Sequence, residues 1–277
     1  IFQTSSDTEV ILQLVARSRE KKIIDKLIDA LNNIKGAYSL VILTNKKLIG
    51  VKDPYGIRPL VLGNKNGSPV LASETCALDM IGANYIRDIE NGEIIVITEE
   101  GIESIKPFKK VKERPCIFER IYFASPDSIV GNKTVYTYRK RLGEQLANEN
   151  NICADVVVPI PDSGVSAAIG FSQRSSIPFE LGIIRSHYVG RTFIEPSQTI
   201  RQFGVKLKHS VNRSCIENKK VILIDDSIVR GTTASKIVKM VYEAGAKEVH
   251  LGISCPPIKY PDFYGIDTPS SEELIAS

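Results

Sequence analysis

Tryptophan is absent from the 277-residue sequence, and methionine and cysteine are scarce, with two and five residues. The cysteines are odd in number and far apart, and no two of them form a Cys-x-x-Cys pair. This spacing argues against a zinc site and against the disulfide framework of a small secreted domain. We therefore expect a reducing, cytoplasmic environment for the five thiols, which belong to Cys76, Cys116, Cys153, Cys215 and Cys255.

Long apolar runs and the common nucleotide-binding loops are also missing. No run approaches membrane-spanning length, and no secretory leader is visible. Neither a Gly-Lys-Ser/Thr phosphate loop nor a Gly-x-Gly-x-x-Gly fingerprint occurs. The net charge of +4 is too small to indicate nucleic-acid binding. The length predicts a globular protein of two domains, with neither a membrane nor a nucleic acid as partner.

A strand, a short polar loop and a helix are predicted between residues 221 and 244. Residues 221–224 are all apolar, which predicts a strand buried on both faces. Asp225 and Asp226 follow it, and apolar side chains recur at helical spacing over residues 234–244. Residues 248–255 predict the next strand. The loop therefore lies at the carboxyl end of a strand, where open α/β sheets bind ligands.

The residues of this loop suit a phosphorylated sugar. Gly231 lets the backbone approach a ligand, and Thr232 and Thr233 supply hydroxyl groups. The amino terminus of the following helix favours a phosphate. Asp225 and Asp226 would repel phosphate, but they could hold two ribose hydroxyls or a magnesium ion beside it. The combination indicates a ribose 5-phosphate that carries further charge.

The nine residues Asp-Asp-Ser-Ile-Val-Arg-Gly-Thr-Thr at 225–233 resemble the phosphoribosyl pyrophosphate (PRPP) signature of type I phosphoribosyltransferases. Their form is similar to that of the glutamine PRPP amidotransferase family, which opens purine synthesis. The resemblance implies an α/β phosphoribosyltransferase fold over residues 111–277, with a mostly parallel sheet and helices on both faces. It implies that Asp225 and Asp226 are catalytic and hold ribose hydroxyls or Mg²⁺. It also assigns substrate binding to Ser227, Arg230, Gly231, Thr232 and Thr233.

A second strand-loop-helix unit precedes the first. Residues 154–160 predict a buried strand, Pro161-Asp162-Ser163-Gly164 follows, and residues 165–172 predict a helix. By itself the tetrapeptide is a good turn. The resemblance makes it a pyrophosphate-binding loop, in which Asp162 and Gly164 bind substrate and Ser163 lies near the magnesium ion.

Residues 185–213 carry six arginines and lysines against one carboxylate, Glu195, which indicates a polyanionic ligand. Residues 190–202 resemble the family's flexible loop, which closes over PRPP, and Arg191 would be its catalytic, pyrophosphate-binding residue. A basic solvated loop is the alternative. RNA binding is disfavoured because few aromatic residues are interleaved.

The first hundred residues predict a separate α+β domain. Ser6 and Glu9 form a capping-box pattern at the start of a helix, and a second helix is expected over residues 21–31. Strands are expected at 37–43 and 48–52, with further hairpin turns at 63–67, 90–92 and 99–101. A basic linker at 106–115 leads to strands expected at 117–124 and 179–184, with a helix at 138–148.

Three stretches of this first part, residues 6–9, 53–60 and 72–79, resemble the later portion of a class II glutamine amidotransferase domain. That domain belongs to the N-terminal-nucleophile hydrolases, and the resemblance covers residues 1–110. It implies that Asp7 binds the α-amino group of glutamine; the alternative is a helix-terminal carboxylate. The family's terminal cysteine nucleophile would lie upstream of Ile1. We therefore expect a fragment lacking both termini that uses ammonia but not glutamine.

Some members of the family carry a [4Fe-4S] cluster. Cys116 matches its first cysteine ligand, but Asp262 stands at the second, so we expect no cluster in this chain. The resemblance also implies a homo-oligomer and purine nucleotides as feedback inhibitors. Two other functions stay open: a type I phosphoribosyltransferase with a nucleobase acceptor, and a non-catalytic module that senses PRPP or a nucleotide.

Overall fold

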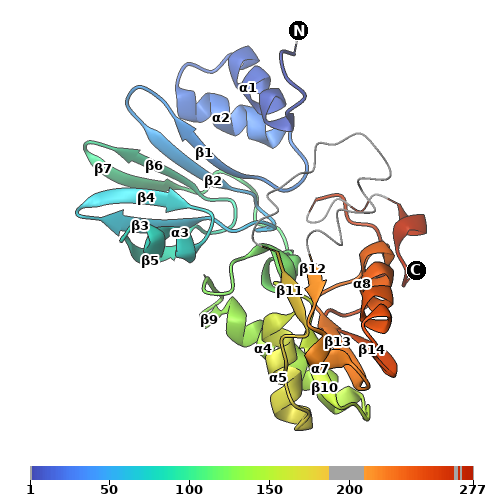
Figure 1. Cartoon of the computed structure of the whole chain (residues 1–277). Coiled ribbons are helices and arrows are strands. Elements are labelled where there is room, and N and C mark those ends of the chain that lie inside the picture. The colour runs from blue at the N-terminus through green and yellow to red at the C-terminus, as the bar shows by residue number, and fades with distance from the viewer. Residues whose placement is uncertain (1, 187–208, 265–267, 269, 277) are drawn as a thin grey trace. The chain divides into compact units, whose positions relative to one another are not determined.

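The computed structural model describes residues 2–186, 209–264, 268 and 270–276 (Figure 1). The chain divides into two compact units, Ile1–Cys116 and Ile117–Ser277. This division lies six residues after the boundary placed at residue 110 from the sequence. Each unit has its own hydrophobic core.

The first unit contains two antiparallel sheets. The four-stranded sheet has the order β1-β2-β6-β7 and the three-stranded sheet the order β4-β3-β5. The strands are β1 Ser39–Leu43, β2 Leu48–Lys52, β3 Val61–Lys65, β4 Ser68–Ala72, β5 Asn84–Asp88, β6 Ile94–Thr98 and β7 Gly101–Ile105. The helices are α1 Asp7–Arg17, α2 Ile23–Asn32 and α3 Thr75–Met80.

Strand β6 shows how the larger sheet is buried on both faces. Ile94 and Val96 pack with Leu27 of α2. Ile95 and Ile97 pack with Leu62 of the second sheet. Successive side chains of a strand point to opposite faces, so one apolar run supplies both cores. Helices α1 and α2 cover the outer face, as Figure 1 shows.

The hairpins expected at 63–67 and 99–101 are present, but the turn at 90–92 joins strands of different sheets, β5 and β6, and is no hairpin. One expected capping interaction is also absent. Asn66 and Gly67 join β3 to β4 with positive φ angles of 52° and 89°, as a two-residue hairpin turn requires. Ser6 precedes α1 but makes no side-chain cap bond. The Glu9 carboxylate instead accepts hydrogen bonds from the backbone N–H groups of Gln3 and Thr4, each at 2.7 Å. The predicted capping box is wrong because the preceding chain, and not Ser6, provides the donors for Glu9.

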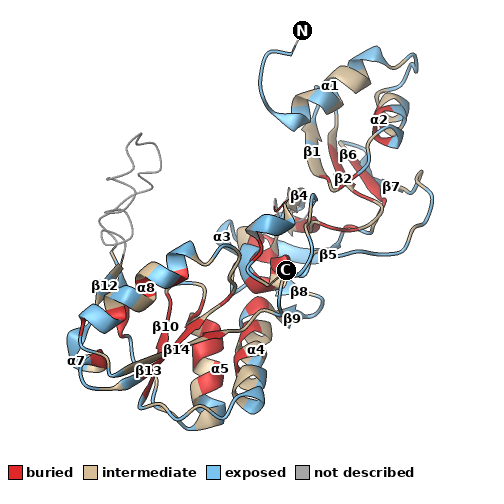
Figure 2. Ribbon diagram, turned by 90° about the vertical axis from the view of Figure 1, so that its right-hand side faces the viewer, coloured by how far each residue is buried: buried red, intermediate tan, exposed pale blue. Residues whose placement is uncertain are grey.

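The second unit is built on a parallel sheet of order β10-β13-β14. Its strands are β10 Val156–Pro159, β13 Lys220–Asp225 and β14 Glu248–Ile253, and its longer helices are α4 Val135–Glu149, α5 Val165–Ser175 and α8 Thr232–Glu243. Val221 and Leu223 pack with Ile237 of α8 on one face. Ile222 packs with Phe171 of α5 on the other. The predicted parallel sheet with helices on both faces is confirmed, and Figure 2 shows the buried residues concentrated on these strands and on α5.

Short elements complete the unit. They are the π-helical turn η1 Glu119–Phe123, β8 Ile129–Val130, β9 Lys133–Thr134, β11 Ile183–Arg185, β12 His209–Val211, α7 Arg213–Ile216 and the 3₁₀ turn η2 Ser271–Glu273. Strands β8 and β9 form a hairpin, and β11 pairs with β12 antiparallel.

Two strands expected in this unit were predicted wrongly. The stretch 117–124 contains the turn η1 and no strand, and Phe118, Ile121 and Ala124 are buried at a spacing of three and not of two. The Arg139 guanidinium fixes this turn by donating to a carbonyl at each end, those of residues 120 and 124. In the stretch 179–184, Phe179 makes a single bridge to Val157, after which the chain leaves the parallel sheet to form β11.

Candidate functional site

The two loops singled out in the sequence lie beside each other at one edge of the parallel sheet. Strand β10 leads through Pro161-Asp162-Ser163-Gly164 into α5, and β13 leads through residues 226–231 into α8. Since β10 and β13 are parallel neighbours, both loops leave from their carboxyl ends. The Ser163 hydroxyl donates to Asp225 Oδ1 at 3.4 Å, which links the first loop to the second.

Gly164 is the residue that allows this close approach. Its N–H donates to the Ile160 carbonyl at 3.0 Å, and the Ile160 N–H donates to the Ile224 carbonyl at 2.9 Å. A Cβ at position 164 would lie 2.2 Å from the Ile224 carbonyl oxygen, which no real side chain tolerates. The tetrapeptide is therefore more than a turn, because its glycine sets the distance between the loops.

A surface pocket of about 500 Å³ lies over the second loop. Gly231 adopts a left-handed conformation with φ of 71° and forms the N-cap of α8, so the amino terminus of that helix opens beside the pocket. Backbone N–H groups and the helix dipole favour an anion there. The pocket is lined by Asp225, Ser227, Ile228, Val229, Arg230, Gly231, Thr232, Thr233, Ala234 and Thr268.

The two adjacent aspartates have different surroundings. Asp225 lines the pocket, and burial, followed by the charge of Asp226, raises the pKa of Asp225 to about 8. Asp226 is 5% exposed, and its Oδ2 accepts a hydrogen bond of 2.7 Å from the Ser227 hydroxyl. The Asp226 N–H donates to Asp225 Oδ1 at 2.9 Å. Burial and the neighbouring carboxylate thus oppose ionisation of Asp225, so a ligand that brings hydroxyl donors or a cation to the pocket would relieve the conflict between the two groups. The role of both carboxylates as ribose or metal ligands stays a prediction.

Three other predicted residues occupy the rim of this region or lie outside the described chain. Asp162 is exposed and forms an ion pair with Arg185 of β11. Arg230 is exposed at the end of the loop. Arg191 and the rest of the basic segment at 187–208 lie outside the described residues.

The structure also shows three residues at the site that sequence reasoning missed, Thr268, Ser254 and Cys255. Thr268 lines the pocket although it comes 35 residues or more after the loop, and no motif marked it. The backbone N–H of Ser254 donates to the Asp225 carbonyl at 3.0 Å, and Cys255 does the same for Asp226 at 2.9 Å. Burial, followed by the charge of Asp226, raises the pKa of the Cys255 thiol to about 11, so this thiol stays protonated at neutral pH. The only sequence signal for Ser254 and Cys255 is that they follow β14, a strand expected to lie parallel to β13 and to end at the same edge of the sheet.

In the first unit, the glutaminase-like motif at 53–60 forms a buried turn. Asp53 is fully buried, and its carboxylate accepts from the N–H groups of Tyr55 and Ile57 at 2.9 and 3.2 Å. Burial raises the pKa of Asp53 despite these bonds. Gly56 has φ of 67°, and a Cβ there would lie 2.1 Å from the Asn91 side chain. These contacts give the motif a structural role.

The remaining candidates of the first unit are exposed or paired within it. Asp7 is exposed in the first turn of α1 and accepts from the Thr8 hydroxyl at 3.4 Å. Cys116 is half-buried, and its N–H donates to the Ile57 carbonyl at 3.1 Å. Asp262, in the second unit, pairs through its backbone with Thr268. Within the described residues, no three His, Cys, Asp or Glu side chains gather closely enough to hold a metal by themselves.

Two family models match the chain in the order that the sequence predicts. A glutamine amidotransferase domain matches residues 1–80, and a phosphoribosyl transferase domain matches residues 127–270. The chain belongs to the phosphoribosyltransferase family. Its relatives within that family are amidophosphoribosyltransferases, so the resemblance found in the sequence is confirmed.

Curated relatives share about half of their residues with this chain. The amidophosphoribosyltransferase of Rhizobium etli is 58% identical over 282 residues, a match that covers all of this chain and 57% of the relative. The chloroplastic enzyme of Glycine max is 55% identical over 278 residues and is covered to 49%. The chain thus spans about half the length of these relatives.

A solved structure agrees with the same assignment. The glutamine PRPP amidotransferase of Bacillus subtilis, in complex with ADP and GMP, is 50% identical with a TM-score of 0.92. The match covers all of this chain and 61% of that one. Among the described residues, no helix is both long and apolar enough to cross a membrane.

Proposed function

We propose that the second unit carries the transferase step of purine synthesis, forming 5-phosphoribosylamine and pyrophosphate from PRPP and ammonia. The supporting observation is that two loop-helix junctions meet at one edge of the sheet. Asp225 lines a pocket there, beside the amino terminus of α8. This arrangement puts an anion-binding helix end next to carboxylates that accept hydrogen bonds from hydroxyls. A phosphorylated ribose carries both groups.

Each loop has a role that its position suggests. Residues 227–233 and the amino terminus of α8 bind the 5-phosphate, and Asp225 accepts hydrogen bonds from the ribose hydroxyls. The loop at 161–164 holds the pyrophosphate, which leaves as ammonia attacks C1 of the ribose. Positioning and charge neutralisation suffice for this displacement, and no covalent intermediate with the protein is needed. Arg191 would join the pyrophosphate from the basic segment and help to exclude water.

A magnesium ion fits the residues beside the pocket. Asp225, Asp226 and the Ser163 hydroxyl supply oxygen atoms only, which is the donor set that Mg²⁺ prefers. Few protein ligands are needed, since Mg²⁺ commonly keeps waters and binds substrate phosphates. When bound, it would neutralise charge on the pyrophosphate. Removing it with EDTA should stop turnover, and added Mg²⁺ should restore it.

The first unit points to glutamine as the source of the ammonia. In the proposed scheme Asp7 contributes only to holding glutamine, because hydrolysis in this family needs an amino-terminal cysteine as nucleophile and as carrier of the base. Asp7 is exposed in the first turn of α1. The transferase step of the second unit needs only ammonia.

Pyrophosphate release from PRPP tests the proposal against its alternatives. The chain is supplied separately with ammonia, with glutamine and with a purine base, and glutamate is measured alongside pyrophosphate. Release with ammonia alone supports the proposal. Release with the base alone would indicate a salvage-type enzyme, and PRPP binding without any turnover would indicate a sensing module. Glutamate above background in the sample with glutamine would show that the first unit hydrolyses glutamine.

Four further expectations belong to this proposal. The B. subtilis structure is a complex with ADP and GMP, which supports purine nucleotides as feedback inhibitors of this chain too. Homo-oligomer formation and a cytoplasmic location stay predictions, and the curated relatives include chloroplastic enzymes. A [4Fe-4S] cluster through Cys116 is not proposed, because Asp262 occupies the second ligand position.

A further inference from the structure

Thr268 is the pocket-lining residue that lies farthest in the sequence from residues 227–233, the proposed phosphate loop. It lines the same pocket as Asp225 and residues 227–234, yet it is only 4% exposed. A hydroxyl so deeply buried must have a hydrogen-bonding partner or a ligand. The contacts of this hydroxyl show which of its two capacities is used.

The Thr268 hydroxyl is used as an acceptor. Its Oγ1 accepts from the Asp262 N–H at 3.2 Å. Its proton donates to no acceptor among the residues that the structure describes, although a hydroxyl can donate once and accept twice. Among the described residues, no acceptor therefore competes with a ligand in the pocket for this proton.

The backbone of Thr268 is fixed independently of this hydroxyl. The Asp262 N–H donates to the Thr268 carbonyl at 3.2 Å, and the Thr268 N–H donates to the Asp262 carbonyl at 3.1 Å. Removing the hydroxyl would therefore leave the Asp262 N–H with its carbonyl acceptor. The side chain can be changed without opening this bridge.

The segment after Thr268 is attached to the phosphate loop itself. The Ile275 N–H donates to the Val229 carbonyl at 3.0 Å, and Ile275 Cδ1 lies 3.1 Å from where a Gly231 Cβ would stand. In Figure 1 the short turn η2 lies beside α8, close to the helix start. The segment is thus tied to the loop at Val229, and Thr268 lines the pocket together with residues of that loop.

We propose that the Thr268 hydroxyl donates a hydrogen bond to the 5-phosphate of the bound ligand, which makes Thr268 a binding residue of this site. The inference rests on the proposed function. The residues that share the pocket with Thr268 are those of the phosphate loop, whose backbone N–H groups and hydroxyls suit the same anion. A hydrogen bond to a charged group contributes more than one between neutral groups.

The test compares Thr268→Val with Thr268→Ser and with the wild-type chain, by calorimetric titration of PRPP with Mg²⁺ and, separately, of ribose 5-phosphate. Valine keeps the shape and removes the donor, so its Kd for both ligands should rise roughly ten-fold or more. Serine should restore near wild-type affinity. Thr137→Val, a half-buried threonine of α4 outside the pocket, should leave both Kd values unchanged.

The outcomes separate this inference from the proposed function. If the wild-type chain binds PRPP and Thr268→Val binds it equally well, the role of Thr268 is wrong while the proposed function stands. If Thr268→Val weakens PRPP but not ribose 5-phosphate, the hydroxyl does not contact the 5-phosphate, and the inference fails. If the wild-type chain binds neither ligand, both fail. Should valine and alanine at position 268 each prevent folding in thermal melts, Thr268 is structural and the inference is overturned.

Discussion

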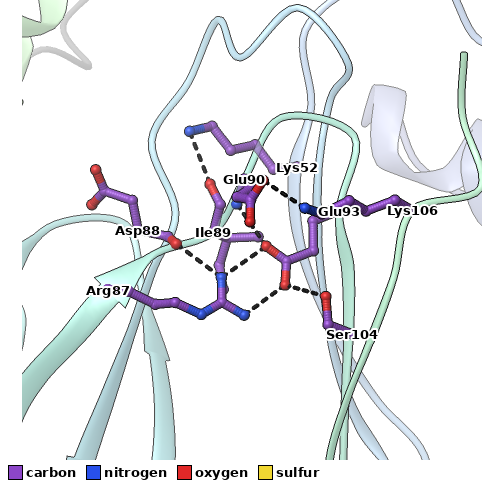
Figure 3. Close-up of polar contacts among 8 residues, drawn as sticks. All are labelled: Lys52, Arg87, Asp88, Ile89, Glu90, Glu93, Ser104 and Lys106. Atoms are coloured by element: carbon purple, nitrogen blue, oxygen red, sulfur yellow. Dashed lines mark hydrogen bonds and ion pairs between the residues drawn. The ribbon is translucent and has the colours of Figure 1, made fainter. Parts of the chain in front are cut away.

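The buried carboxylate of Glu93 offers the most direct test of what holds the first unit together. Glu93 is fully buried at the start of β6, and Figure 3 shows the polar contacts around it. Its two oxygens accept from the Arg87 guanidinium at 2.6 and 2.8 Å. They also accept from the Ser104 hydroxyl and the Glu90 N–H, each at 2.7 Å.

The pKa of Glu93 gives the size of the effect. Burial alone would raise this pKa, but the bonds from Arg87, Glu90 and Ser104 outweigh it and lower the pKa to about 2, against an ordinary value of 4.5. A shift of that size corresponds to about 3 kcal/mol of stability. Since the Arg87 side chain is 37% exposed, solvent screening reduces this to about 2 kcal/mol. The contribution is complete above pH 4.5 and is lost as the pH falls from 4.5 toward 2.

Replacing Arg87 by methionine should cost more than this contribution. The carboxylate stays buried without its cation, a situation that typically costs 3–5 kcal/mol, so we expect Arg87→Met to destabilise the first unit by about 3 kcal/mol at pH 7. In the variant, burial raises the pKa of Glu93. The penalty therefore shrinks as the pH falls below about 5 and the carboxyl becomes protonated. Adding Glu93→Gln should recover most of the loss, because the amide oxygen still accepts from Ser104 or Glu90.

Hydrogen exchange measured by mass spectrometry suits this prediction, because the chain has no tryptophan and its two units need separate readouts. Peptides from β5 to β7 report on the first unit, and peptides from β13 and β14 serve as the internal reference. Lys106→Met is the matched control, since Lys106 and Glu90 form an exposed pair worth at most about 1 kcal/mol. Equal protection in Arg87→Met and Lys106→Met at pH 7 would refute the reasoning, as would a loss that does not depend on pH.

Three further predictions concern the second unit and the cysteine at the boundary. Gly164→Ala should destabilise the second unit by about 1–3 kcal/mol and abolish PRPP binding, because the new Cβ would collide with the Ile224 carbonyl; a wild-type thermal midpoint would contradict it. Asp225→Asn should stop PRPP turnover and raise the thermal midpoint more at pH 8 than at pH 5. The folded pKa of Asp225 is about 8 against an ordinary 3.8, so wild-type stability falls as the pH rises between these values. An equal change at both pH values would count against the buried pair. After anaerobic purification the chain should be colourless, with no iron bound at Cys116, and stoichiometric iron with a broad visible absorbance would overturn this.

The sequence predicts most reliably the elements whose burial follows one simple period. Residues 221–224 are apolar without interruption and form the central strand β13, with a core on each face. The hairpin at Asn66 and Gly67 carries its own turn chemistry. In both places the local pattern and the final packing agree, so the neighbours of the segment need not be known.

Where tertiary contacts decide, the sequence misleads. Residues 117–124 contain enough aromatic and β-branched residues for a strand, yet they form the turn η1, whose carbonyls bind Arg139 of a later helix. Glu9 has the spacing of a capping box, but donors from the preceding chain take its carboxylate. In both cases the deciding partner lies outside the local pattern: Arg139 for the turn, and the N–H groups of Gln3 and Thr4 for Glu9.

The candidate site combines these two cases. Each loop can be recognised from its own sequence, but the two loops form one site only because the parallel pairing of β10 with β13 aligns the two strand ends. Gly164 then sets the distance between the loops, although its tetrapeptide reads locally as an ordinary turn. The difference between Asp225, which lines the pocket, and its buried neighbour Asp226 likewise depends on Ser227 and on the chain after β14. A sequence motif therefore locates such a site, but the contribution of each of its residues depends on the strands that carry them. A residue such as Thr268, which lines the pocket from a distant segment, can be found only in the folded chain.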